Sequence, residues 1–254
     1  MTRDTWEGAI LGAVLGSLVI PGVLWLVDRI SRWWHDSRPA RQLFGGIAHD
    51  AEHCKIFVRD FLIGADTRLI SVEPRVGIGV VPNVQHLWPD VEGRAVGALF
   101  NVFGQVGKTR GIEIVRMSED AGEWNCHIIV LGAQANKSYD FYKHLRNVAF
   151  RMDGEQIYEN ATGKIVKRED GFGYGIILKS LNPFKTTSPP GVGILIGGFG
   201  VLGTGAAAHY FREHYKSLGK EFGSRCFGVV VRAPITAGEQ AVERLSIWDR
   251  TFGC

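Results

Sequence analysis

The longest uncharged run of the chain lies close to its N-terminus. Residues 8–27 contain no Asp, Glu, Lys or Arg, and about 20 apolar residues are enough for a helix to cross the hydrocarbon core of a membrane. Trp6 and Trp25 lie near the two ends of the run, where an indole suits the membrane interface. A cleaved signal peptide would begin with a basic region, whereas Arg3 is offset here by nearby acids. We therefore expect a retained transmembrane helix over residues 1–28.

Basic residues predict how this helix is oriented. Only Arg3 precedes it, whereas residues 29–41 contain four arginines, and cytoplasmic flanks carry the excess of positive charge. Residues 29–41 should form a polar linker or a juxtamembrane helix closed by Pro39. Residues 42–254 should then form one cytoplasmic domain.

Small residues on the N-terminal helix predict self-association. Gly8, Gly12 and Gly16 recur every four residues and share one face, so neighbouring helices can approach closely. Pro21 follows at a position where a kink or hinge costs little. We expect a homo-oligomer in the lipid, and a pore would need four or more helices, with a tetramer favoured.

The composition indicates a folded, nearly neutral chain. Of 254 residues, 45% are hydrophobic and 22% are charged, and the formal net charge is only +3. This charge argues against a partner of duplex nucleic acid. The cysteines are far apart with no C-x-x-C pair, which predicts reduced thiols rather than a zinc ribbon or a disulfide framework. They are Cys54, Cys126, Cys226 and Cys254.

Strand and helix patterns alternate along the body, which predicts an α/β fold. We expect a Rossmann-like, three-layer domain with a mostly parallel sheet. The expected strands are 51–62, 68–74, 111–118, 124–133, 173–180, 192–200 and 226–234, with a hairpin over 156–170. The expected helices are 88–107, 135–147 and 204–223, and 241–249 is a final strand or short helix.

A glycine-rich junction follows the strand at 192–200. Gly198, Gly200 and Gly203 spell G-x-G-x-x-G, and Thr204 is expected to open the next helix. Backbone N–H groups at a helix N-terminus favour an anion, which predicts phosphate contact. A tight turn with close helix packing is the alternative interpretation of these glycines.

A second junction repeats this plan after the strand at 124–133. Because doubly wound sheets bind ligands at the carboxyl ends of their strands, both junctions and Arg232 should face one crevice. Amide, lysine and hydroxyl side chains here could contact base, ribose or phosphate, although ordinary helix capping explains some of them equally well. The expected ligand residues of this junction are Gly132, Gln134, Asn136, Lys137 and Ser138.

The segment 71–95 lacks periodicity and is rich in polar and aromatic residues, which is typical of a functional loop. Trp88 could stack on a base and Arg75 could bind phosphate. Equally, Trp88 could fasten the loop to the core.

Neither metal chemistry nor catalysis is indicated. His49 and His53 are four residues apart, but the sequence offers no convincing third ligand. No nucleophile motif such as G-x-S-x-G is present. We therefore expect no cofactor, no metal and no catalytic residue.

The stretch GGFGVLGTGAA resembles the glycine loop of SLOG-type Rossmann-like domains. That superfamily includes nucleotide-cleaving hydrolases and ligand sensors of bacterial defence proteins. Its hydrolases carry G-G-x-G-T-x-x-E, whereas Ala207 stands here where the glutamate would fall. The resemblance therefore implies phosphate binding more than hydrolysis.

A glycine-lined helix joined to such a domain is similar to transmembrane effectors of anti-phage signalling, the Hailong-type channel effectors in particular. This resemblance implies a bacterial inner-membrane protein whose channel responds to a nucleotide or oligonucleotide messenger made by a partner nucleotidyltransferase. The rival hypothesis is a membrane-tethered enzyme that cleaves nucleotides at an N-glycosidic or phosphate bond.

Overall fold

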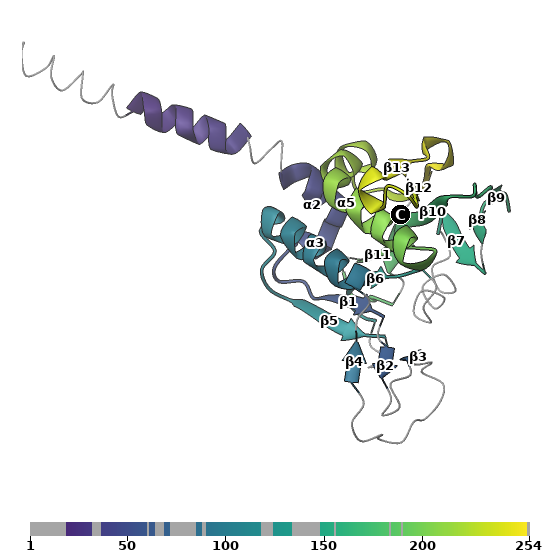
Figure 1. The fold of residues 1–254 in the computed structure, drawn as a ribbon. Coiled ribbons are helices and arrows are strands. Elements are labelled where there is room, and N and C mark those ends of the chain that lie inside the picture. The colour runs from purple at the N-terminus through teal and green to yellow at the C-terminus, as the bar shows by residue number, and fades with distance from the viewer. Residues whose placement is uncertain are drawn as a thin grey trace, which may run out of the picture.

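The computed structural model shows a mixed α/β chain built on a central eight-stranded sheet (Figure 1). It describes residues 19–31, 37–59, 61–63, 69–71, 85–87, 90–117, 124–133, 148–154, 156–182, 184–188 and 190–252.

The central sheet has the strand order β13-β12-β10-β11-β6-β1-β5, and β14 also pairs with β12. Because β5 and β6 lie on opposite sides of β1, the chain reverses its direction of winding between β1 and β6. The strands are β1 (Cys54–Val58), β5 (Ile112–Arg116), β6 (His127–Leu131), β10 (Phe172–Asn182), β11 (Gly191–Gly198), β12 (Cys226–Pro234), β13 (Glu243–Arg244) and β14 (Arg250–Phe252).

Half of the sheet is parallel. Strands β5, β1, β6 and β11 run in one direction, which confirms the expected parallel region. Strand β10 runs against both β11 and β12. The reason is the short connection between Asn182 and Gly191, since a parallel crossover needs a dozen or more residues.

Within the described residues, three helices cover one face of the sheet, and a small sheet contributes to the core on the other face. The helices are α2 (Arg38–Phe44), α3 (Asp90–Val106) and α5 (Gly200–Phe222), and their apolar faces share one core with β1, β6 and β11. A second core joins the central sheet to the small sheet. That small sheet consists of β7 (Phe150–Asp153), β8 (Gln156–Glu159) and β9 (Ile165–Val166). A separate, third sheet consists of β2 (Phe61–Ile63), β3 (Leu69–Ser71) and β4 (Gln85–Leu87).

Most predicted elements within the described residues are confirmed. Helix α3 and the β8–β9 hairpin lie where the sequence predicts them. The C-terminal segment contains the short helices η3 (Glu239–Ala241) and η4 (Ser246–Trp248) beside β13. The helix predicted at 135–147 lies outside the described residues.

Helix α2 belongs to the core of the body. Pro39 lies in its first turn instead of closing a preceding helix, because the ring of proline suits a helix start. Leu43 and Phe44 are fully buried. Helix α5 approaches α2 so closely that a Cβ on Gly219 would lie 2.0 Å from the carbonyl oxygen of Pro39. The tightly packed body therefore begins at α2, a few residues after the helix at 19–31.

Residues 19–31 form a helix that projects away from the body (Figure 1). Its apolar side chains are exposed on all sides, and the guanidinium of Arg29 lies 5.1 Å from the ring of Trp25. Pro21 is helical, whereas Gly8, Gly12 and Gly16 lie outside the described residues. Within the described part of the chain, no helix is both long and apolar enough to cross a membrane.

The expectation of reduced thiols holds for two of the described cysteines and fails for a third. Cys226, at the start of β12, is disulfide-bonded, so that prediction was wrong for this residue. Cys54 and Cys126 are free and buried, and they belong to cores on opposite faces of the sheet. Spacing along the chain could not reveal the bond, since disulfides join residues by distance in space.

A buried lysine joins α2 to the end of α5. Lys179 of β10 is 4% exposed, and its ammonium donates hydrogen bonds to the carbonyl oxygens of Gln42 (3.2 Å) and Gly223 (3.1 Å). Burial lowers the pKa of Lys179 to about 8. The positive charge lies at the C-terminus of α5, where the helix dipole favours it.

Relative to a Lys179→Met variant, the wild-type chain is expected to gain stability as the pH rises from 8 to 10.5. The native pKa of about 8 lies below the ordinary value of 10.5, so the unfolded chain binds more protons in this window and rising pH favours the native state. The gain should reach at most about 3 kcal/mol. Urea unfolding of both proteins at pH 7.5 and pH 10 measures it, and an equal pH response of the two would contradict it.

Candidate functional site

The two predicted junctions lie side by side at the carboxyl ends of β6 and β11. Leu131 pairs with Ile196, and the N–H of Gly132 donates a 2.9 Å hydrogen bond to the carbonyl oxygen of Ile196. A Cβ on Gly197 would lie 2.3 Å from the backbone nitrogen of Ala133. The prediction that the two junctions share one edge of the sheet is confirmed.

Two glycines of the G-x-G-x-x-G pattern allow the start of α5 to pack against the sheet. A Cβ on Gly198 would lie 2.3 Å from the carbonyl carbon of Gly203, and a Cβ on Gly203 would lie 2.1 Å from the carbonyl oxygen of Tyr174. The N–H of Gly198 donates to the hydroxyl of Thr204 at 3.2 Å. At Gly198 and Gly203, the glycines therefore serve close helix packing, which was the alternative interpretation of the pattern.

Helix α5 begins at Gly200, four residues before Thr204. Its N-cap is Phe199, whose side chain makes no capping hydrogen bond. Gly200 has φ +61° and its Cα faces open space, a backbone conformation that glycine adopts readily. The N–H groups of residues 200–202 are therefore the ones in this junction that an anion could approach.

Arg232 reaches the same edge of the sheet within a network of ion pairs. Its guanidinium lies 2.5 Å from a carboxylate oxygen of Glu243 and 2.7 Å from one of Glu169, over the ring of Phe172. The hydrogen bond to Glu243 is the main cause that raises the pKa of Arg232. In the structure, the guanidinium of Arg232 is therefore held in ion pairs at this edge.

A buried carboxylate that was not predicted from the sequence lies where the winding reverses. Glu92, in the first turn of α3, is 3% exposed. It accepts a 2.5 Å hydrogen bond from the N–H of Arg59, just after β1, and its other oxygen would lie 3.0 Å from a Cβ on Gly132. The burial of Glu92 could have been predicted from its position on the apolar face of the helix, three residues before Ala95 and seven before Leu99.

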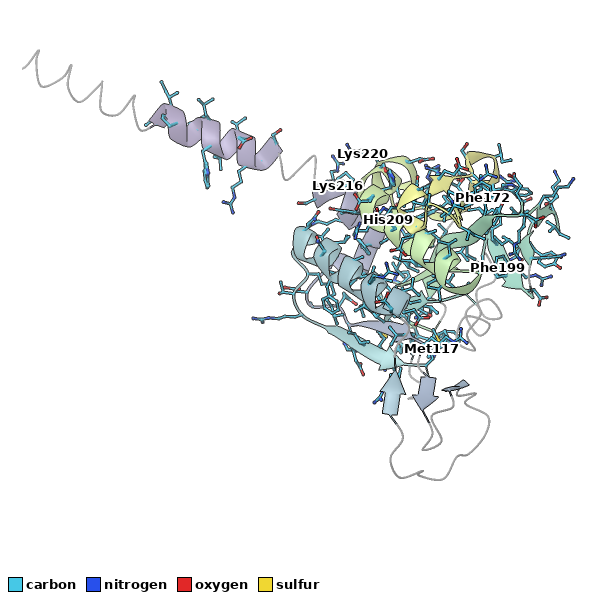
Figure 2. All side chains as sticks on the ribbon, in the orientation of Figure 1. Met117, Phe172, Phe199, His209, Lys216 and Lys220 are labelled. Atoms are coloured by element: carbon cyan, nitrogen blue, oxygen red, sulfur yellow. The ribbon has the colours of Figure 1, made fainter. Side chains whose placement is uncertain are left out.

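A hollow of about 680 Å³ opens beside the start of β10. Arg168 belongs to its lining, and its guanidinium lies 4.4 Å from the ring of Phe199, the N-cap of α5. Figure 2 labels Phe172 and Phe199 on this side of the molecule. The volume falls in the range of ligand pockets, about 300–1,000 Å³. The lining consists of Gln156, residues 165–172 and Ile235.

A second hollow, of about 230 Å³, separates α3 from α5. Ala95 and Gly205 form part of its floor, and Arg94 binds Glu239 across one end. The volume lies below the range for pockets that hold a whole ligand of nucleotide size. The first hollow is therefore the better candidate for a nucleotide site.

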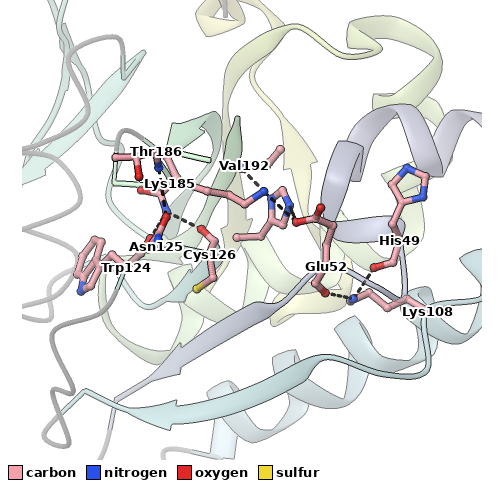
Figure 3. Close-up of polar contacts among 11 residues, drawn as sticks. His49, Glu52, Lys108, Trp124, Asn125, Cys126, Lys185, Thr186 and Val192 are labelled. Atoms are coloured by element: carbon pink, nitrogen blue, oxygen red, sulfur yellow. Dashed lines mark hydrogen bonds and ion pairs between the residues drawn. The ribbon is translucent and has the colours of Figure 1, made fainter. Parts of the chain in front are cut away.

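A polar cluster occupies the opposite edge of the sheet, where the parallel strands begin (Figure 3). His127 is fully buried, its Nδ1 accepts a hydrogen bond from the N–H of Val192 (2.9 Å), and its Nε2 lies 3.4 Å from Glu52. Lys185 binds the same carboxylate oxygen of Glu52 at 2.8 Å.

Burial lowers the pKa of His127 to about 4, so the imidazole is neutral at pH 7. Lys108 donates to the carbonyl oxygens of His49 and Glu52, both at 2.8 Å. These contacts fix residues 49–52 to the loop before β11 and to the loop before β5. The described partners of His127 are the N–H of Val192 and the carboxylate of Glu52.

Several predicted site residues lie outside the described residues. They are Arg75, Trp88, Gln134, Asn136, Lys137 and Ser138.

No protein-family model matches the chain, and no curated protein matches it. Among the described residues, no group of His, Cys, Asp or Glu side chains could hold a metal ion.

Proposed function

We propose that this protein is a membrane-anchored effector whose Rossmann-like body binds a nucleotide or oligonucleotide and thereby controls an oligomeric pore. In this proposal residues 1–28 span the inner membrane of a bacterium, and the body lies in the cytoplasm as a SLOG-type sensor. A partner nucleotidyltransferase supplies the ligand. The ligand acts by binding one assembly state more tightly than the other, and a hundredfold preference supplies about 2.7 kcal/mol.

The observation that carries the proposal is the meeting of three features at one edge of the sheet. The ends of β6 and β11 are neighbours, α5 begins there without a side-chain cap, and Arg168 stacks on the N-cap residue while lining the 680 Å³ hollow. An uncapped helix N-terminus and a nearby guanidinium both favour a phosphate group. The tight packing of α2 against α5 offers a route to the anchor.

Two observations give opposite predictions for the side of the membrane on which the body lies. The arginines after residue 28 favour the cytoplasm, whereas the disulfide of Cys226 is more typical of an oxidising compartment. Protease treatment of intact spheroplasts tests the orientation, and protection of the body is the expected result.

Replacing Arg168 with alanine is expected to weaken ligand binding by about tenfold to a hundredfold, because a charge-assisted hydrogen bond contributes about 1.5–3 kcal/mol. Mass spectrometry of small molecules released from the purified full chain measures retention of the ligand. Arg151→Ala is the matched control, since Arg151 also stacks on an aromatic ring, Tyr158. A nucleotide retained equally by both variants would contradict the assigned site, and its absence from the wild type would contradict the sensor.

The pore is tested separately with Gly12→Leu, which enlarges the proposed helix-packing face. We expect loss of ligand-dependent membrane leakage while the nucleotide stays bound, because the bulkier side chain separates the helices. Leakage that persists unchanged would make the helix a passive anchor.

One observation favours the rival enzyme. The buried carboxylate of Glu92 lies where the winding reverses, and a desolvated carboxylate there could act as a general base or a nucleophile in glycosidic cleavage. Nucleotide breakdown by the purified protein that Glu92→Gln abolishes would favour this second function.

A further inference from the structure

The last described strand of the chain lies next to a disulfide. Cys226, the first residue of β12, is disulfide-bonded, and it lies opposite Phe252 in the register between β12 and β14. The chain has four cysteines, of which Cys54 and Cys126 are free. Elimination leaves Cys254 as the second cysteine of the bond. It follows Phe252 by two positions in the sequence and lies outside the described residues.

Strand β14 connects β12 with the small sheet. Its backbone pairs with the start of β12, and the guanidinium of Arg250 binds the buried carboxylate of Glu159 on β8. Strand β8 pairs in turn with β9, whose residues Ile165 and Val166 line the 680 Å³ hollow. Strand β14 therefore helps to hold the hairpin that carries one wall of this hollow.

The segment before β14 is bound to the end of α5. Arg244 of β13 donates to both carboxylate oxygens of Glu221, at 2.7 and 2.6 Å. It also donates to both oxygens of Asp249, at 3.0 and 2.6 Å. Beyond this point β14 itself is only three residues long. Because each backbone hydrogen bond contributes little net free energy, a covalent link at the end of so short a strand should matter for keeping it in place.

A bond between Cys226 and Cys254 closes the loop from residue 226 to residue 254. Such a cross-link disfavours release of the strand, because it removes much of the conformational freedom that the released end would gain. For a loop of this length, the population of the released state should fall by a factor of about 30 or more. Breaking the bond should raise that population again.

We propose that the disulfide between Cys226 and Cys254 is a redox-controlled clasp. While the bond is intact, β14 stays paired with β12 and the β8–β9 hairpin stays in place, and reduction of the bond loosens both. In a reducing cytoplasm the clasp would be open at rest and would close under oxidation. Neither the membrane anchor nor the ligand of the proposed function is needed for this clasp.

The reductant is a dithiol. One of its thiolates attacks a sulfur of the bond to form a mixed disulfide, and the other protein sulfur leaves as a thiolate and takes up a proton. The second thiol of the reductant then closes the reductant's own disulfide and releases the second protein thiol, so two electrons and two protons pass to the protein. Cys226 is 1% exposed. A reductant that stays outside the core therefore attacks Cys254, and Cys226 is the leaving thiol.

Peptide mass spectrometry of the full chain tests which cysteines are bonded. The protein is equilibrated with glutathione disulfide, unfolded in iodoacetamide and digested without a reductant. We expect a cross-linked pair of peptides that contains Cys226 and Cys254, with Cys54 and Cys126 alkylated. Cys226 found in any other form would overturn the proposal.

Hydrogen exchange of the oxidised and the dithiothreitol-reduced protein tests the clasp. After reduction, exchange in residues 250–252 is expected to rise at least tenfold, and exchange in β8 at least threefold, because Arg250 no longer holds Glu159. Strand β1 lies elsewhere in the sheet, serves as the internal control and should not change. Unchanged exchange in β14 after complete reduction would overturn the proposal. An equal rise in β1 would also overturn it, since the bond would then stabilise the whole fold rather than one strand.

Two variants sharpen the test. Cys254→Ser should exchange rapidly in β14 with and without dithiothreitol, because its clasp cannot close. Cys126→Ala removes a free thiol instead and should keep the full response. A response that persists in Cys254→Ser, or that is lost in Cys126→Ala while Cys226 stays bonded, would overturn the proposal.

Discussion

Replacing Gly203 with alanine is expected to destabilise the fold by about 3 kcal/mol, although alanine is ordinarily the better helix former. The new Cβ would lie 2.1 Å from the carbonyl oxygen of Tyr174. The position of a Cβ is fixed by its own backbone, and the carbonyl oxygen of Tyr174 is itself a backbone atom. No side-chain rotation can therefore relieve the overlap, and α5 would have to move away from β10. A loss of this size is a large part of the usual 5–15 kcal/mol of a domain.

Gly104→Ala is the matched control for this substitution. Gly104 lies in α3, and a Cβ there meets nothing within 4 Å. The variant should therefore be stabilised by about 0.5–1 kcal/mol, the ordinary gain from glycine to alanine in a helix. Chemical unfolding of both variants gives the two values. Equal stability of Gly203→Ala and the wild type would show that the close approach does not hold α5 in place.

Truncating Phe44 to alanine should destabilise the body by about 3–5 kcal/mol. The ring is fully buried, with its centroid 5.3 Å from that of Phe103 on α3 and 5.7 Å from that of Phe211 on α5, both edge to face. Since α2 adjoins the N-terminal segment, the loss should also release α2 from the body. Hydrogen exchange across residues 38–44 should rise with the fall in unfolding free energy.

Phe100→Ala controls for the loss of an aromatic ring in the same region. Phe100 is 42% exposed, and its centroid lies 6.4 Å from that of Phe103. Its truncation should cost about 1 kcal/mol, because a large part of the ring is already exposed to water. If both truncations had similar effects, α2 would not be held by this aromatic cluster.

The buried strands and long helices could be predicted because their signals are local. Strand β11 is an unbroken apolar and glycine run buried at every position, and α3 carries its apolar residues at helical spacing. The neighbouring junctions after β6 and β11 followed from the rule that parallel strands end at one edge. The antiparallel direction of β10 follows from the short connection after Asn182.

The candidate site was predictable only in part. The sequence located both junctions, but it could not distinguish a glycine that binds phosphate from one that lets two backbones touch, as Gly198 and Gly203 do. Glu92 and Arg168 were missed because their placement depends on contacts with Arg59 and Phe199, residues more than 30 positions away. The disulfide of Cys226 was missed because spacing along the chain does not show which thiols meet in space.

By itself, the sequence determined the apolar N-terminal run, the α/β class and the order of most strands and helices, since these depend on composition and periodicity within short windows. Only the tertiary structure decided which glycines pack, that α2 joins the core, and that β14 pairs with β12. Those features depend on pairs of residues far apart in the chain, whose distances are fixed when the shared core excludes water and closes around them.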